Sequence, residues 1–281
     1  MAIGWEALWE KTIKESSLRK KRRDIREIER LNQSAERLFK KRGREVLQKG
    51  TSKNDKIDVE FCRMKRFINP DSSVLDIGAG TGRLAIPLAK MVKNVTVVEP
   101  ARIFMMLLRE NAERERIDNI EFVENLWTDF QPRKKYDLVY ATWSPSIRDP
   151  AALMKMHRSS CSYCALEMVA SPYQDWDFYG QIYPMVMEED FRSHGNYLNI
   201  LTTLYEHEIY ANLETWEFKD EIKYTGMKEA LGSWENGLSD YVVLTERTKE
   251  LLGQYYRSMM NSDGSYTYPV KGVSCMIWWK V

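Results

Sequence analysis

The chain has 281 residues, enough for one large α/β domain or one domain with a helical extension. Its composition, 43% hydrophobic and 30% charged with neither Gly nor Pro in excess, is typical of a folded protein. No uncharged apolar run approaches the roughly 18 residues that a membrane-spanning helix needs. The first residues lack the basic start of a signal peptide. We therefore expect a cytoplasmic protein with no membrane partner.

Charge is unevenly distributed, although the net charge is only +1. Residues 11–66 hold 20 Lys and Arg against 9 Asp and Glu, whereas residues 67–281 hold 22 against 30. A basic segment before an acidic body can mark an anionic partner, and it can equally be a solvated helix, which is the commoner outcome.

Four cysteines are too few and too scattered for a disulfide scaffold in a chain of this length. Cys161 and Cys164 form the one close pair, with no second pair and no nearby His at ligand spacing. We therefore expect no metal site, and we interpret the four cysteines as small buried hydrophobic residues.

In chain order, residues 5–48 are predicted to be helical in two or three pieces, and a short helix follows from 57 to 68. Residue 73 begins an alternation of β-branched strands and helices of about ten residues. Five strands are expected at 73–77, 94–98, 120–123, 136–142 and 163–168, with helices at 83–92, 102–113 and 150–158. The later chain is predicted to add an insertion at 171–196, helices at 197–208 and within 226–260, and strands at 209–218 and 272–280.

These patterns indicate an α/β fold. Near-continuous apolar strands separated by helices are typical of a parallel sheet covered on both faces. The two late strands lack a crossover helix pattern, so we expect them to pair antiparallel at one edge, giving a mostly parallel seven-stranded sheet. As domains we predict an N-terminal helical extension or lid over 1–56 and an α/β domain over 57–281. Insertions are expected at about 171–200 and 225–260.

The segment that carries chemistry is the glycine-rich turn after the first strand, with glycines at 78, 80 and 82. Glycine permits positive φ and lets a ligand approach the backbone without meeting a Cβ atom. A dinucleotide fingerprint needs a glycine where Arg83 stands. The carboxylate of Asp76 would repel a pyrophosphate and would attract a cationic amino group or sulfonium. No Lys-Ser/Thr pair of a nucleotide-triphosphate loop follows.

Residues 74–82 resemble the first motif of class I S-adenosylmethionine-dependent methyltransferases, and the resemblance extends over about 57–168. It implies a Rossmann-like fold, S-adenosylmethionine as cofactor and S-adenosylhomocysteine as product. Glu99 ends the second strand, where a carboxylate of this family accepts the ribose hydroxyls, and Leu126 and Trp127 follow the third strand, where adenine binds. The implied cofactor-binding residues are Asp76, Gly78, Ala79, Gly80, Glu99, Pro100, Leu126, Trp127 and Thr142. Trp127 is equally well interpreted as a core residue.

Substrate-side candidates follow from the rule that ligands bind outside the carboxyl ends of the strands. Trp143 and Ser144 directly follow the fourth strand, and Tyr179 and Tyr183 belong to an aromatic cluster after the fifth strand. Aromatic faces stabilise cations, although these rings could equally pack the insertion. No residue is assigned as catalytic from the sequence.

Three functions remain open from the sequence. A methyltransferase acting on a small molecule is favoured by the aromatic insertion. An RNA or protein methyltransferase is motivated by the basic residues between 11 and 66, which could contact phosphates. The third is a non-catalytic protein that binds S-adenosylmethionine.

Overall fold

The computed structural model describes residues 4–17, 27–49, 55–172 and 176–281. The chain divides into two compact units, neither of them continuous in sequence. Unit 1 comprises residues 1–25, 169–199 and 214–275, and unit 2 comprises 26–168, 200–213 and 276–281. The predicted extension over 1–56 falls partly in each unit, and its boundary and its role as a lid stay predictions. No described helix is long and apolar enough to cross a membrane.

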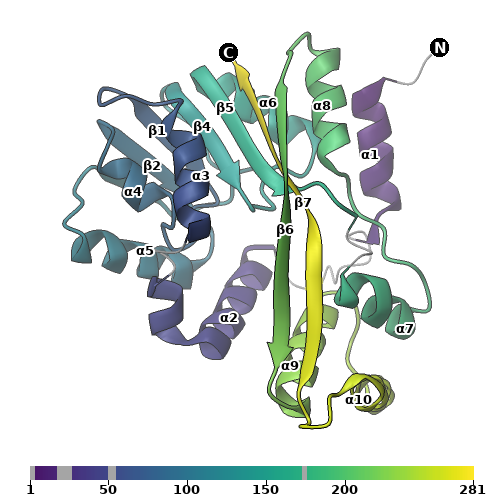
Figure 1. The fold of residues 1–281 in the computed structure, drawn as a ribbon. Helices are drawn as coiled ribbons and strands as arrows, with labels where there is room; N and C mark the ends of the chain where they lie inside the picture. The colour runs from purple at the N-terminus through teal and green to yellow at the C-terminus, as the bar shows by residue number, and fades with distance from the viewer. Residues whose placement is uncertain (1–3, 18–26, 50–54, 173–175) are drawn as a thin grey trace. The chain divides into compact units, whose positions relative to one another are not determined.

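Unit 2 contains five parallel strands and the helices between them (Figure 1). Its strands are β1 Ser73–Ile77, β2 Asn94–Val98, β3 Ile120–Val123, β4 Tyr136–Thr142 and β5 Ser160–Val169. Its helices are α2 Glu27–Lys49, α3 Asp55–Lys65, α4 Ala85–Ala89, α5 Arg102–Arg114, α6 Pro150–Ser159 and most of α8 Tyr197–Glu206. The predicted strands and helices are confirmed to within a few residues, except that α4 is much shorter than the 83–92 expected.

The strands form a seven-stranded sheet in the order β3-β2-β1-β4-β5-β7-β6. Neighbours among the first five are parallel, and Asp76 of β1 pairs in register with Tyr140 of β4. The last two strands, β6 Asn212–Tyr224 and β7 Tyr266–Lys280, run in opposite directions (Figure 1). The predicted mixed sheet is therefore confirmed. Its parallel strands are buried because α4, α5 and α6 pack against β2, β3 and β4.

Unit 1 contains α1 Trp5–Glu15, a π-helical turn at Phe178–Ile182, α7 Tyr183–Met187, α9 Met227–Leu238, α10 Glu246–Met259 and parts of β6 and β7. Its core is rich in aromatic side chains, among them Tyr224, Trp234, Tyr256 and Tyr266. Asp177 lies within this core and accepts hydrogen bonds from Tyr255 Oη at 2.5 Å and Tyr266 Oη at 2.9 Å. The predicted insertions at 171–200 and 225–260 lie in this unit.

The cysteine prediction is right for two residues and wrong for two. Cys164 and Cys275 are buried, whereas Cys62 and Cys161 are exposed. Cys161 is the second residue of β5, ahead of the run of buried residues that begins at Cys164, and Cys62 lies on an exposed position of α3. Among the described residues, no group of three or more His, Cys, Asp or Glu side chains is placed to hold a metal ion.

Candidate functional site

The glycine turn joins β1 to α4 through three left-handed residues. Gly78, Gly80 and Gly82 have φ values of 78°, 57° and 86°, which L side chains rarely adopt. The Gly78 N–H donates to the Val98 carbonyl at 2.7 Å, so the turn is tied to the end of the neighbouring strand β2. The predicted glycine motif is therefore a rigid turn at the carboxyl edge of the parallel sheet.

Gly80 and Gly78 differ in what lies beside them. A Cβ atom added to Gly80 would meet nothing within 4 Å. At Gly78 the same atom would lie 2.1 Å from Ser144 Oγ, so the loop after β4 packs directly against the turn. The open backbone at Gly80 is where a ligand can approach, and Ser144, a predicted substrate-side residue, lies next to the turn.

Glu99 braces the glycine turn from the end of β2. Its Oε2 accepts the Gly80 N–H at 2.9 Å, and its Oε1 accepts the Ala101 N–H at 2.8 Å. Burial raises the pKa of this carboxyl, while the two backbone donors favour its charged form. Each oxygen keeps a second lone pair, so the carboxylate can hold the turn and still accept a ligand hydroxyl. Pro100 is buried beside it.

Asp76 is the buried carboxyl behind the turn. Tyr140 Oη donates to its Oδ2 at 2.6 Å across the β1–β4 pair. Burial, with a smaller contribution from Glu99, raises the pKa of Asp76 to about 7. Asp76 is therefore poised between its neutral and charged forms at neutral pH, so its attraction for a cationic ligand group depends on pH.

A second buried carboxyl, Glu167, lies at the end of β5. It is in register with Thr142 of β4, and its carbonyl accepts the Trp143 N–H at 2.9 Å. Glu167 is 3% exposed, and its Oε2 has no hydrogen-bond partner among the residues that the structure describes. Burial raises the pKa of Glu167 to about 7, although the charges of Arg63 and Arg83 act against the rise. An unpaired buried carboxyl oxygen is costly, and such groups are typical of functional sites.

Glu60 of α3 connects this carboxyl edge to the glycine turn. It forms an ion pair with Arg83, the residue after the turn, and its Oε1 accepts the Trp143 indole N–H at 3.3 Å. Trp143 has a left-handed backbone, φ 53°, and its side chain is 45% exposed. A strained, exposed tryptophan at the end of a buried strand suits a ligand contact better than core packing.

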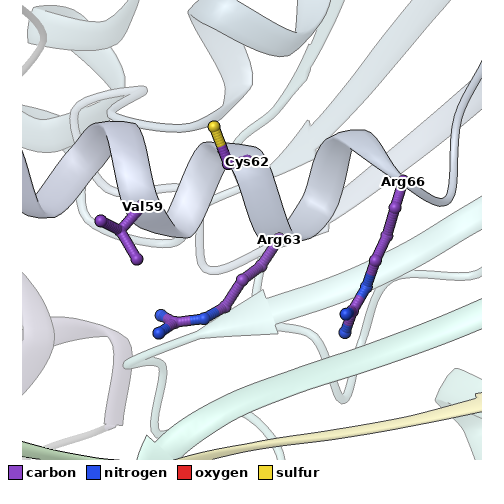
Figure 2. A pocket seen from close by; sticks show the side chains of 4 residues that line it. All are labelled: Val59, Cys62, Arg63 and Arg66. Atoms are coloured by element: carbon purple, nitrogen blue, oxygen red, sulfur yellow. The ribbon is translucent and has the colours of Figure 1, made fainter.

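A surface pocket of about 380 Å³ lies along α3 (Figure 2). Val59, Arg63 and Arg66 project to one side of the helix in this view, and Cys62 projects to the other. Arg63 is the residue whose charge lowers the pKa of Glu167, so this pocket borders the carboxyl edge of the sheet. Sequence patterns singled out neither Arg63 nor the pocket.

The segment after β3 is placed as the sequence predicts, but the side chain of Trp127 lies in the core. Trp127 is 2% exposed, donates its indole N–H to the Ala152 carbonyl at 3.2 Å and contacts Phe130. Leu126 is partly buried, and its backbone N–H donates to Asn125 Oδ1. Core packing therefore accounts for the Trp127 indole in this structure, and adenine contact by Leu126 and Trp127 stays a prediction.

Helix α2 is anchored near the same edge of unit 2. The Arg148 guanidinium, in the loop after β4, pairs with both carboxylate oxygens of Glu27. Asn32 Oδ1 accepts the Arg102 N–H at 2.8 Å, at the start of α5 and three residues after Glu99. These contacts place α2 against two loops at the carboxyl edge of the sheet.

The aromatic cluster that includes Tyr179 and Tyr183 belongs to unit 1. Tyr183 is fully buried and contacts Phe191 and Tyr241, and the Tyr179 ring lies 4.3 Å from that of Phe191. Their packing inside unit 1 accounts for these rings, and their role toward a substrate stays a prediction.

Comparison with known proteins decides the family of the central region. Residues 74–161 match the family model described as a methyltransferase domain. This stretch is a methyltransferase domain. This region begins in β1 and includes the glycine turn, Glu99 and the end of β4, so the predicted resemblance is confirmed.

Curated relatives match this chain over stretches of very different length. The chain is 34% identical over 83 residues to ribosomal RNA small subunit methyltransferase A of Desulforapulum autotrophicum, a match that covers 28% of this chain. The chain thus spans only 29% of that relative's length. An uncharacterized protein of Haemophilus influenzae is 23% identical over 217 residues, covering 76% of this chain and 78% of the relative.

Solved structures share the fold at low sequence identity. A protein from Bacillus halodurans C-125, named provisionally as a methyltransferase, has a TM-score of 0.55 and 15% identity, covering 79% of this chain and 98% of its own. The YcgJ protein of Bacillus subtilis has a TM-score of 0.56 and 12% identity, covering 80% and 97%. These likenesses support the fold.

Besides Arg63, three residues of the site escaped the sequence prediction: Glu60, Tyr140 and Glu167. Tyr140 and Glu167 lie inside apolar strands and are indistinguishable from core residues in the sequence, and Glu60 is one carboxylate among many in a charged helix. The acidic residue at 167 inside an otherwise apolar strand was the available signal, because a carboxylate is almost never fully buried without a reason.

Proposed function

We propose that this protein is an S-adenosylmethionine-dependent methyltransferase whose cofactor binds along the backbone of Gly80. The open, left-handed Gly80, held by the buried carboxylate of Glu99, is the observation that carries the proposal. A ligand with vicinal hydroxyls at one end and a cationic group at the other suits this edge. Glu99 offers free lone pairs for the hydroxyls, and Asp76 offers a carboxyl that ionises near neutral pH.

S-adenosylmethionine, when bound, supplies a methyl group that an acceptor lone pair takes in a direct displacement. The contribution of the protein is orientation, since such a step needs neither a metal nor a covalent enzyme intermediate. In this proposal Glu99 holds the ribose, Asp76 attracts the amino group, and the segment at Leu126 and Trp127 borders adenine. Closure of α2 over the edge excludes water.

We place the acceptor, a small molecule, beside Trp143 and Ser144, because these residues follow β4 and Ser144 lies against the glycine turn. Glu167 is the proposed proton acceptor for a protonated nucleophile. Its unpaired Oε2 and a pKa of about 7 suit a group that takes up a proton at neutral pH. The proton leaves the acceptor atom as its new bond to carbon forms.

Calorimetry with S-adenosylmethionine tests the cofactor site. The Gly80→Val variant should lose detectable binding, because its side chain would fill the open space and strain a φ of 57°. Gly80→Asn separates the two causes, since asparagine tolerates left-handed backbone and still fills the space. Normal affinity in a folded Gly80→Asn variant would contradict the placement of the cofactor.

A second candidate acceptor is RNA. The Desulforapulum autotrophicum relative is named for ribosomal RNA, and residues 11–66 are strongly basic. Most basic side chains of that segment lie outside the part of the chain that the structure describes. Among them are Arg22, Arg23, Lys41 and Arg42. Reversing these four charges should abolish activity if RNA is the acceptor and leave turnover unchanged if it is a small molecule.

The acceptor class is directly measurable with radiolabelled S-adenosylmethionine and cell extract. Label that passes an ultrafiltration membrane in a compound other than S-adenosylmethionine itself indicates a small-molecule acceptor. Retained label that nuclease releases indicates RNA, and retained label that protease releases indicates protein. Transfer to none of them, together with normal cofactor binding, would favour the non-catalytic binding protein.

A further inference from the structure

A basic pocket of about 620 Å³ lies at the opposite edge of the sheet in unit 2, where β4 and β5 begin. We call it the amino-edge pocket, and five of its nine lining residues are cationic: Arg133, Lys134, Lys135, Lys155 and Arg158. None of the lining residues is acidic or aromatic. This gathering of cationic side chains is unusual, because residues 67–281 as a whole carry more acidic than basic side chains.

Two of the five cations are engaged within the protein. Lys155 Nζ donates to the carbonyls of Trp127 at 2.5 Å, of Thr128 at 3.2 Å and of Phe130. Burial lowers the pKa of Lys155, and the charge of Asp129 partly opposes this. Lys134 Nζ donates to Asn94 Oδ1 at 3.0 Å and lies 5.2 Å from the centroid of the Tyr136 ring. These two lysines stabilise the walls of the pocket.

The other three cations, Arg133, Lys135 and Arg158, are exposed and make no hydrogen bond or ion pair with any residue that the structure describes. Lys135 and Arg158 lie close enough to His157 that their charges, after burial, lower its pKa. Like charges gathered without direct contact to a carboxylate repel one another, so an anion bound here would reduce that repulsion.

The placement of the cations disfavours a small caged anion. Sites that enclose a small anion often use a helix N-terminus, where free N–H groups point at the ligand. This pocket instead lies at the C-terminal end of α6, where the carbonyls and the helix dipole repel a buried anion. Long, exposed side chains from a loop and a helix suit several phosphates of an extended polyanion.

We propose that the amino-edge pocket binds the phosphate backbone of a nucleic-acid duplex. A duplex fits better than a single strand because the lining offers no aromatic ring on which an unpaired base could stack. Binding here does not depend on the methyl donor, since the pocket and the glycine turn lie at opposite edges of the sheet. The surface would hold a nucleic acid by charge, without reading its sequence.

Fluorescence anisotropy with a labelled RNA hairpin and a DNA hairpin of about 20 base pairs tests this proposal on the full chain. The triple variant Arg133→Gln, Lys135→Gln and Arg158→Gln should weaken binding of both hairpins at least tenfold. The slope of log K against log salt should fall by about 2 to 3, because each lost phosphate contact contributes about 0.9. The single variant Arg158→Gln should lower the slope by about 1, and both variants should keep the wild-type melting temperature and S-adenosylmethionine affinity.

A matched control removes three exposed cations of unit 1 with the same change in net charge: Lys228→Gln, Arg247→Gln and Lys271→Gln. Equal weakening in the control and pocket variants would overturn the proposal, because only net charge would then matter. Full competition by millimolar inorganic phosphate at constant ionic strength would also overturn it, in favour of a small-anion site. Loss of hairpin binding with retained cofactor binding separates this inference from the proposed methyl transfer.

Discussion

The two edges of the parallel sheet in unit 2 carry charges of opposite sign, and these charges are buried at one edge and exposed at the other. At the carboxyl edge, Asp76, Glu99 and Glu167 are buried, and the first two accept hydrogen bonds from other strands or from the glycine turn. At the amino edge, Arg133 and Arg158 are exposed and lack partners among the described residues.

The contrast shows how one sheet can serve two kinds of ligand. Buried carboxyls in a fixed frame can recognise one small cationic molecule, because charges act strongly where water is excluded. Exposed cations on long side chains hold an extended polyanion loosely and are screened by salt. The four predictions below test the carboxyl edge, and the hairpin experiment tests the amino edge.

The largest effect is expected at Glu99. Glu99→Ala leaves the N–H groups of Gly80 and Ala101 without their acceptor and removes the proposed ribose contact. Hydrogen bonds to a charged group contribute about 1.5–3 kcal/mol each, so S-adenosylmethionine affinity measured by calorimetry should fall about 100-fold or more. Glu124→Gln is the matched control, because Glu124 is exposed and its ion pair within the described chain is with Arg102; a similar loss there would contradict the assignment.

The second largest effect is expected on turnover, when Glu167 is replaced. Glu167→Gln should lower turnover at pH 8 about 100-fold, with cofactor affinity unchanged within threefold, if Glu167 accepts the proton. The folded pKa of about 7 exceeds the ordinary 4.5, so its contribution to stability is present at low pH and lost as pH rises through 7. The variant should therefore melt several degrees above wild type at pH 8 and within about one degree of it at pH 4, below the ordinary pKa. Unchanged turnover with this stability pattern would leave Glu167 a structural residue only.

The third prediction concerns the pH dependence of cofactor binding. Because a cationic ligand favours the charged form of Asp76, whose pKa is about 7, affinity should rise roughly tenfold between pH 5.5 and 7. Asp76→Asn should bind weakly with no such rise. Tyr140→Phe removes a hydrogen bond that lowers the pKa of Asp76, so the rise in cofactor affinity should occur at higher pH in this variant. A wild-type affinity that is flat over this range would show that Asp76 does not meet the cationic group.

The smallest effect is expected at the anchor of α2. Glu27→Gln weakens the contact with Arg148, and S-adenosylmethionine should then dissociate about three to ten times faster in stopped-flow measurements if α2 covers the site. Glu29→Gln, an exposed carboxylate on the same helix, should leave the dissociation rate unchanged. Equal rates in both variants and wild type would refute the lid.

Most of the fold could be predicted from the sequence, because its strands are short, apolar and separated by amphipathic helices. The glycine turn was predictable for a local reason: glycine adopts the left-handed φ at 78, 80 and 82 without the strain that most side chains would add. Glu99 was located by its place at the end of the second predicted strand, and the structure joins it to Gly80 by a direct hydrogen bond. The helix at 83–92 was predicted too long because the turn extends to Leu84 before regular helix begins.

What only the tertiary structure decided is the chemistry of buried and clustered charges. Sequence spacing shows neither that Tyr140 reaches Asp76 nor that Oε2 of Glu167 has no partner, because both depend on pairing between strands 64 or about 25 residues apart. The cations of the amino-edge pocket come from two segments that meet only when β4 and β5 align. By itself, the sequence determined the sheet, the turn and the methyltransferase family, since these rest on local conformation and short spacing. Burial set the pKa values, and the packing of a loop against α6 set the amino-edge pocket, because both are properties of the packed chain.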